Sequence, residues 1–257
     1  MQNGRRFFST YVADLPGATV LDIGAAGVSL RSACPASATY TGVDMVAGPG
    51  VDVVLEDPYR LPYANESVDV IVSTSCFEHA DMFWLLYLEI MRVLRPSGLF
   101  YMCAPSNGTY HRFPIDCWRF YPDCGVAFVA WGKRNGMNNA VLESYTSDQH
   151  LRENWNDFVC VFIKDRAHAE RYPKRILDSI SDYSNGLRGP RDEDLPLLHP
   201  QRRPEDQRLG GWRLHKRLHY LGWFLKTGHG AWDPEKRWKD RASTDSGAPP
   251  ARRPPAR

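Results

Sequence analysis

A run of almost continuous apolar and β-branched residues at 68–75 most constrains the fold of this 257-residue chain. Such a run indicates a strand that is buried on both faces, and strands of this kind occur mainly in parallel sheets covered by helices. Similar short runs predict four further strands, at 18–24, 38–44, 51–57 and 98–105. The chain is therefore expected to build its core around a parallel sheet.

Helical patterns separate most of these strands. They are predicted at 4–14, 28–34, 82–95 and 123–136. Two later runs, at 140–147 and 158–165, also predict strands, but no helix lies between them, so we expect them to pair antiparallel at an edge. The pattern predicts an α/β fold with a parallel sheet, an antiparallel edge strand and helices on both faces.

Charge is distributed unevenly along the chain. Residues 1–165 contain 12 Lys and Arg against 18 Asp and Glu, whereas residues 166–257 contain 20 against 12. This change from an acidic body to a basic tail indicates a boundary near residue 165. We expect a folded domain at 1–165, a basic helical extension at 166–242 and a disordered Pro- and Arg-rich tail at 243–257.

The basic extension contains helical stretches at 167–181 and 211–226. The second stretch is aromatic and roughly amphipathic, which suits packing on a protein surface, contact with a membrane surface, or RNA binding. We favour packing, either on the domain or between the subunits of a homo-oligomer. Nucleic acid is disfavoured, because the body is acidic and no RNA-binding module is recognised.

Several protein classes are excluded by what the chain lacks. No run approaches the roughly 18–20 apolar residues of a membrane span, and the first residues do not resemble a secretory signal. The cysteines are scattered without C-x-x-C pairs, which favours reduced thiols in a cytoplasmic protein over a disulfide framework or a metal site. They are Cys34, Cys76, Cys103, Cys117, Cys124 and Cys160.

The segment from Val20 to Gly27 carries the first sign of a binding site. A buried strand ends there in a turn of small residues that enters a short helix. Small residues let a ligand approach the backbone, and a helix N-terminus offers free N–H donors. The same turn would serve a structural role in many α/β proteins, so further residues are needed to decide.

Those residues follow in order. Asp44 ends the second strand, where a carboxylate is placed to accept hydrogen bonds from ribose hydroxyls. The other segments are Glu56-Asp57-Pro58-Tyr59-Arg60-Leu61-Pro62-Tyr63, Ser67-Val68-Asp69-Val70-Ile71, Glu78-His79 and Arg92-Val93-Leu94-Arg95-Pro96-Ser97-Gly98. Together with the turn they resemble, over residues 18–104, the class I S-adenosylmethionine-dependent methyltransferases of the methyltransferase-11-like group. The resemblance implies a Rossmann-like fold and S-adenosyl-L-methionine as the cofactor.

The resemblance also implies roles for individual residues. Asp44 would hold the ribose, Met45 would pack on the adenine, and Asp57, with Glu56 before it, would accept from the adenine amino group. Asp22 would organise the first loop, which includes Ala26, and Gly24 and Gly27 would lie near the amino-acid part of the cofactor. Ser73, Thr74 and Ser75 would line its methionine end. One position departs from the family, because Ala26 stands where its second glycine is expected. NAD is disfavoured, since no G-x-G-x-x-G is present.

The acceptor is expected at the loop 105–122, beyond the fifth strand. Its aromatic, arginine and polar residues suit a sugar, and the string at 111–123 resembles one in methyltransferases of polysaccharide and natural-product clusters. His111 is predicted as the general base, with Asp116 as its orienting partner or as an alternative base. In the competing interpretation Asp116 pairs with an arginine, either Arg112 or Arg119, and Trp118, Phe120 and Tyr121 seat the loop on the core.

His79 is interpreted as structural or cofactor-side rather than as a base. The sequence thus predicts a methyltransferase that modifies an oxygen of a sugar or another small molecule. The alternative is a non-catalytic scaffold that keeps the fold, for which Ala26 in the cofactor turn leaves room.

Overall fold

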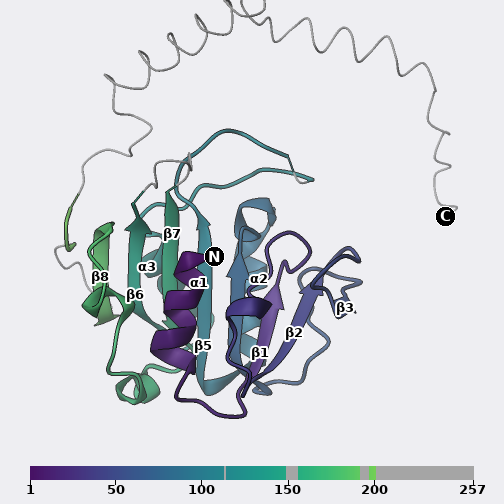
Figure 1. The fold of residues 1–257 in the computed structure, drawn as a ribbon, viewed down its shortest axis with the longest axis horizontal. Helices are drawn as coiled ribbons and strands as arrows, with labels where there is room; N and C mark the ends of the chain where they lie inside the picture. Colours follow the sequence, from purple (N-terminus) through teal and green to yellow (C-terminus); the bar gives the residue numbers. More distant parts are fainter. Residues whose placement is uncertain (113, 149–155, 192–196, 201–257) are drawn as a thin grey trace, which may run out of the picture. The chain divides into compact units, whose positions relative to one another are not determined.

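The apolar run at 68–75 forms β4 (Val68–Thr74), which lies inside an eight-stranded sheet of the computed structural model (Figure 1). The strand order is β3-β2-β1-β4-β5-β7-β6-β8. The other strands are β1 (Thr19–Ile23), β2 (Thr39–Asp44), β3 (Val53–Val54), β5 (Leu94–Pro105), β6 (Ala140–Ser147), β7 (Asp157–Ile163) and β8 (Tyr183–Arg191). The structure describes residues 1–112, 114–148, 156–191 and 197–200.

The sheet is parallel from β3 to β5 and antiparallel beyond it. β1 pairs in parallel with β2 and β4, and β4 does so with β5. β7 is antiparallel to both β5 and β6, which confirms the pairing expected for two strands joined without a helix. Chain order reverses between the neighbours β1 and β4. Open α/β sheets bind ligands beyond the carboxyl ends of the strands at such a point.

Helices cover both faces of the sheet, as predicted. One face packs against α2 (Phe83–Val93) and α3 (Cys124–Arg134), where Ile71 shares a core cluster with rings from both helices. The other face, which includes Val70 and Val72, packs against the N-terminal segment. Successive β4 side chains therefore enter opposite cores, as a strand requires. The remaining helical elements are α1 (Gln2–Phe7), η1 (Phe8–Val12), η2 (Arg31–Ala33), η3 (Phe77–His79), η4 (Arg166–Arg171) and η5 (Ile176–Asp178).

The sheet extends past residue 165, where the sequence predicted the domain to end. β8 pairs antiparallel with β6 and adds a strand beyond the expected edge. The predicted helix over 167–181 is also wrong, because η4 and η5 are two short 3₁₀ helices. Pro173 lies between them and disfavours a continuous helix. The expected helix at 211–226 and the tail after it lie outside the described residues.

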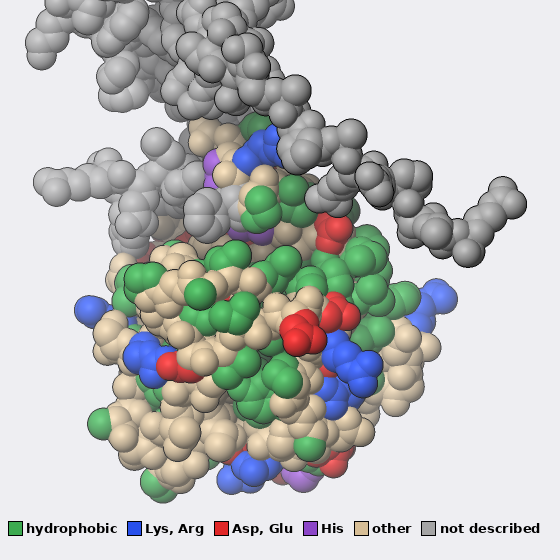
Figure 2. All heavy atoms as spheres, turned by 90° about the vertical axis from the view of Figure 1, so that its right-hand side faces the viewer, with side chains coloured by type: hydrophobic (Ala, Val, Ile, Leu, Met, Phe, Trp, Pro, Cys, Tyr) green, Lys and Arg blue, Asp and Glu red, His purple; other side chains and the backbone are tan. Residues whose placement is uncertain are grey.

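Exposed apolar side chains lie at the β3 side of the sheet. Figure 2 views this side and shows hydrophobic side chains interspersed with both acidic and basic ones. Met45 and Val46, which follow β2, and Val54 of β3 are each more than half exposed. Within the part of the chain that the structure describes, no helix combines the length and apolar character needed to cross a bilayer.

Candidate active site

The turn after β1 is built around Gly24. Its φ of 86° lies in the left-handed region, and a Cβ there would lie 2.5 Å from the Cβ of Cys76. Glycine is therefore required at this position by both conformation and space. Ala26, by contrast, is not among the residues with positive φ. The alanine that departs from the family pattern consequently imposes no backbone strain on the turn.

Asp22 lies beneath this turn and is fully buried. Its Oδ2 accepts hydrogen bonds from the Leu30 N–H (3.2 Å) and from the Tyr40 hydroxyl. Its Oδ1 has no partner among the described residues, and burial raises the pKa of the carboxyl to about 6. Thr74 Oγ1, at the end of neighbouring β4, is likewise buried without a described partner. Two such atoms at adjacent strand ends fit a polar ligand such as the amino-acid part of S-adenosylmethionine.

Asp44 joins the first two strand ends. Its Oδ2 accepts from the Ala26 N–H (3.0 Å), and its Oδ1 accepts from the Val46 N–H (3.2 Å). Met45 beside it is exposed, as an adenine-packing residue needs to be before its ligand binds. The structure thus joins Asp44 to the glycine turn, and the cofactor roles of Asp44 and Met45 stay predictions.

The remaining predicted cofactor residues follow β3 and β4. Glu56 and Asp57 are exposed, and Asp57 Oδ1 accepts from the Tyr59 N–H at 2.8 Å. Ser73 is buried, and its hydroxyl donates to the Ile23 carbonyl (3.0 Å), so it ties β4 to β1. Ser75 is exposed and adopts a φ of 52° just beyond the strand. Ser73 therefore has a structural contact, while Ser75 is open to a ligand.

The two glycines of the turn give a contrasting pair of substitutions. We expect Gly24→Ala to destabilise the fold by roughly 1–3 kcal/mol, because the added methyl is strained in φ and overlaps Cys76. A methyl group added at Gly27 would meet no atom within 4 Å, so Gly27→Ala is expected to change stability by less than about 0.5 kcal/mol. Thermal unfolding measures both. Equal melting temperatures for the two variants would contradict the description of the turn.

The acceptor-side loop projects beyond the sheet at the end where β1 and β2 terminate (teal in Figure 1). Asp116 organises it, with a side chain only 1% exposed. Its two oxygens accept from Arg119 Nη1 (2.6 Å) and Nη2 (2.8 Å), and Oδ2 also accepts from the His111 N–H (2.7 Å). The Arg119 contacts hold the pKa of Asp116 at about 2. Of the two predicted roles, this pairing suits the orienting partner and makes Asp116 a weak base.

His111 is partly exposed, and its ring Nδ1 faces two oxygens. The Thr109 carbonyl lies 3.3 Å from it and Asp116 Oδ2 lies 3.4 Å from it. Two acceptors at Nδ1 favour the tautomer that carries its proton there. The lone pair then resides on Nε2, the nitrogen that can accept a proton.

His79 and Glu78 lie next to His111, which the sequence analysis did not foresee. The two imidazoles meet edge to face, with their centroids 5.0 Å apart. His79 Nδ1 is hydrogen-bonded to the Ile115 carbonyl, and its Nε2 lies 3.8 Å from Glu78 Oε1. Glu78 is buried, and burial raises its pKa to about 7. The order of the strands could have indicated this proximity. Glu78-His79 follows β4 and His111 follows β5, and these two parallel strands are neighbours in the sheet.

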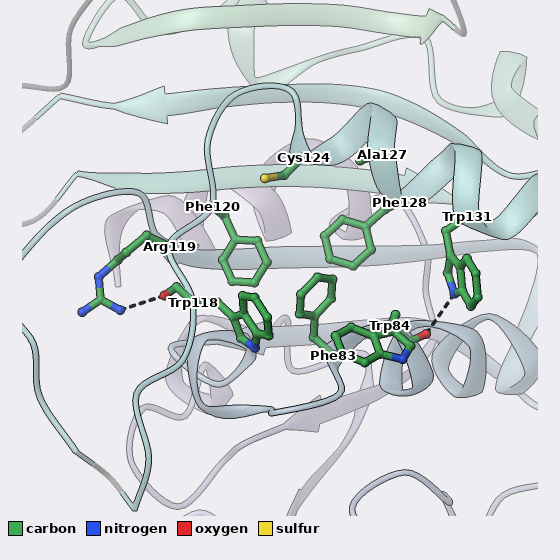
Figure 3. Close-up of a pocket in the computed structure, with 9 residues that line it drawn as sticks. All are labelled: Phe83, Trp84, Trp118, Arg119, Phe120, Cys124, Ala127, Phe128 and Trp131. Atoms are coloured by element: carbon green, nitrogen blue, oxygen red, sulfur yellow. Dashed lines mark hydrogen bonds between the residues drawn. The ribbon is translucent and has the colours of Figure 1, made fainter.

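An aromatic pocket of about 490 Å³ is linked to this cluster by Trp118, which lines the pocket and whose backbone N–H donates to the Glu78 carbonyl (3.2 Å). Figure 3 shows the rings of Phe83, Phe120 and Phe128 turned toward one another with Trp118 alongside, while Arg119 points away. The pocket is lined by Phe83, Trp84, Trp118, Arg119, Phe120, Cys124, Ala127, Phe128 and Trp131. Backbone carbonyls accept from two of the three indole N–H groups in the lining, those of Trp118 (Ala80, 2.9 Å) and Trp131 (Trp84, 3.2 Å). The pocket therefore offers mainly apolar ring surface.

The aromatic residues of the loop have different positions. Phe120 is buried in the core, and Trp118 packs against it while bordering the pocket. Tyr121 is about half exposed. Seating of the loop on the core, the competing interpretation, thus accounts for Phe120 but not for Tyr121.

Known proteins match part of this chain in sequence. The model of a family described as a methyltransferase domain matches residues 21–102. Phthiotriol/phenolphthiotriol dimycocerosates methyltransferase of Mycobacterium tuberculosis is 37% identical over 34% of this chain and 37% of that protein. An uncharacterized methyltransferase of Mycobacteroides abscessus is 37% identical over 33% of this chain and 39% of its own. The chain thus spans about two-fifths of the length of these curated relatives.

A solved structure extends the likeness of the fold. The Burkholderia thailandensis 1,6-didemethyltoxoflavin-N1-methyltransferase, solved with 1,6-didemethyltoxoflavin and S-adenosylhomocysteine, matches with a TM-score of 0.51 at 16% identity. The match covers 64% of this chain and 77% of that one. The family match, the relatives and the fold agree: residues 21–102 are similar to a methyltransferase domain, and the sheet around them has the fold of an S-adenosylmethionine-dependent methyltransferase.

Proposed function

We propose that this protein transfers a methyl group from S-adenosylmethionine to a hydroxyl oxygen of a small-molecule acceptor, a sugar or a natural product. The observation that carries the proposal is the meeting of His79 and His111 beyond the carboxyl ends of β4 and β5. Trp118, which lines the aromatic pocket, is hydrogen-bonded to the residue before His79, because its backbone N–H donates to the Glu78 carbonyl (3.2 Å). The cofactor supplies a methyl group on a positively charged sulfur, and transfer to oxygen forms a C–O bond, breaks the C–S bond and releases the hydroxyl proton.

Two groups of residues would take part, one that binds the cofactor and one that removes the proton of the acceptor. On the cofactor side, Asp44 would accept from the ribose. Asp22 Oδ1 and Thr74 Oγ1, which have no partner among the described residues, would face the amino-acid part. On the acceptor side, His111 would take the hydroxyl proton at Nε2. Its Nδ1–H would remain oriented by Thr109 and Asp116. A general base is needed for a hydroxyl but not for an unprotonated amine, so the imidazoles favour oxygen as the methylated atom.

The pocket supports an acceptor with an apolar face. Sugars present such faces between their hydroxyl edges, and aromatic rings pack well against them. A natural product with an aromatic or aliphatic part would use the same ring surface. The relative named for phthiotriol and phenolphthiotriol dimycocerosates is consistent with the second kind of acceptor.

Transfer of a labelled methyl group tests the proposal. The full chain would be incubated with labelled S-adenosylmethionine and sets of nucleotide sugars, glycosides and small phenols. We expect label in the acceptor at an ether oxygen, which mass spectrometry locates. Methylation found only at nitrogen or carbon would contradict oxygen transfer. Calorimetry without binding of S-adenosylmethionine would favour the scaffold alternative, which otherwise loses its support because Ala26 leaves the turn unstrained.

Asp44→Ala tests the cofactor side separately. Loss of a charge-assisted contact to the ribose is expected to weaken S-adenosylmethionine binding by roughly 1.5–3 kcal/mol, or about 10–150-fold in Kd. Isothermal titration measures this. Asp14→Ala, at an exposed carboxylate paired only loosely with Lys174, is the matched control and should bind normally. Unchanged affinity in a folded Asp44→Ala protein would remove Asp44 from the site.

A further inference from the structure

Three ligand-type side chains converge beside the acceptor pocket. One donor atom from each of Glu78, His79 and His111 lies within 4.8 Å of the donor atoms of the other two. Two imidazole nitrogens and a carboxylate oxygen form the donor set of many catalytic zinc sites, which keep a further position open. His111 is partly exposed, so a fourth position can be reached from solvent.

Both imidazoles are held as metal-ligating histidines usually are. His79 Nδ1 is hydrogen-bonded to the Ile115 carbonyl, and His111 Nδ1 faces the Thr109 carbonyl and Asp116. Metal-bound histidines typically donate their other ring N–H to such a carbonyl or carboxylate. This arrangement places the lone pair of each ring on Nε2, the nitrogen that would ligate a cation.

Glu78 supplies the independent observation. The side chain is nearly fully buried, yet its Oε2 has no hydrogen-bond partner among the described residues. A buried carboxylate oxygen without a donor is costly, and a cation satisfies it. The nearby Arg119 guanidinium donates both of its terminal nitrogens to Asp116, while its positive charge acts on Glu78 from a distance and lowers the pKa of that carboxyl.

The geometry points to a divalent metal site formed by Glu78, His79 Nε2 and His111 Nε2, suited to Zn²⁺ or a similar borderline cation. Donor atoms around zinc lie roughly 3–3.5 Å apart, so ligation requires the three side chains to close in by small rotations. This differs from the sequence analysis, which expected no metal site. The site rests on geometry alone, whereas its role rests on the proposed function. A bound cation would lower the pKa of the acceptor hydroxyl, and His111 would then be a ligand rather than the base, so the hydroxyl proton would pass to solvent at the partly exposed site.

Cobalt titration of the chelator-treated full chain tests this site. Co²⁺ reports its ligands through visible absorption, and Zn²⁺ should displace it. We expect saturable binding of one equivalent, weakened at least about 100-fold in Glu78→Gln and in His111→Ala. His168→Ala, at an exposed histidine of η4, is the matched control and should bind like wild type. Circular dichroism and S-adenosylmethionine titration show whether each variant is folded.

The outcomes separate this site from the proposed function. Absence of saturable binding in the wild type, or unchanged affinity in both Glu78→Gln and His111→Ala, would overturn the metal site. Should Glu78→Gln fail to fold, the partly exposed His111 still provides the test. Methyl transfer that persists after complete metal removal would refute the metal's catalytic role while leaving oxygen methylation intact. Metal binding without any methyl transfer would leave the metal site intact but contradict the proposed function, and with it the metal's catalytic role.

Discussion

Glu143→Ala is expected to lower the free energy of unfolding by about 3–5 kcal/mol. Glu143 lies on β6, fully buried, and accepts three hydrogen bonds that join separate parts of the chain. Its Oε1 accepts from the Tyr11 hydroxyl (2.6 Å) and the Ile176 N–H (2.8 Å), and its Oε2 accepts from the Leu177 N–H (3.0 Å). Alanine would leave one hydroxyl and two backbone donors buried without partners, and each such group costs about 1–3 kcal/mol.

Urea denaturation followed by circular dichroism measures this loss. The expected change is a large share of the roughly 5–15 kcal/mol typical of a whole domain. Glu143→Gln keeps the shape but replaces one acceptor by an NH₂ group facing a donor, so an intermediate loss is expected. Glu170→Ala, at an exposed glutamate of η4, is the control and should stay within about 0.5 kcal/mol. A Glu143→Ala protein as stable as this control would show that the buried network contributes nothing.

The same carboxylate illustrates why the end of the domain was misplaced. Burial of Glu143 depends on η5, and η5 lies within the segment expected to form a separate extension. The strand that follows, β8, reads Tyr-Ser-Asn-Gly-Leu-Arg-Gly-Pro-Arg and has neither alternation nor an apolar run. It joins the sheet through backbone pairing with β6, and such pairing leaves little trace in side-chain patterning.

Strands of the parallel core were predictable because each is apolar on both faces. The helical pattern at 82–95 corresponds to α2 in the structure. Its end before Pro96 was predictable, because proline and glycine in Arg95-Pro96-Ser97-Gly98 disfavour a continued helix. β5, however, begins at Leu94, four residues earlier than predicted, because the chain reaches the sheet before the glycine. The proline and glycine thus indicated where α2 ends, but they did not indicate the first residue of β5 that pairs in the sheet.

Contacts in the candidate site were predictable only between residues that belong to the same short sequence motif. The turn after β1 and Asp44 fall within short spacings of the family pattern, and the structure joins them through the Ala26 N–H. Asp116 and Arg119 are three residues apart, so their pairing was one of the foreseen alternatives. Glu78 and His111 are far apart in sequence, and a strand, a helix and a loop must all be placed correctly before they meet.

His111→Ala is expected to lower turnover about 10²–10⁴-fold while S-adenosylmethionine affinity stays nearly unchanged. The reason holds for either role of the imidazole. As a base it takes the hydroxyl proton at Nε2, and as a metal ligand it holds the cation that acidifies that hydroxyl. His111 follows β5, which β1 and β4 separate from β2 and its last residue Asp44, so cofactor binding is not expected to follow the loss.

Initial rates with labelled S-adenosylmethionine and the identified acceptor measure the effect, and calorimetry checks the cofactor. Asp116→Asn should cost less than His111→Ala, because the Thr109 carbonyl still faces Nδ1 when the carboxylate is lost. His168→Ala serves as the histidine control and should retain full turnover. If His111→Ala and Asp116→Asn both react at the wild-type rate, proton removal must occur elsewhere, at His79 or not at all. The loop beyond β5 would then serve only to bind the acceptor and to pack on the core.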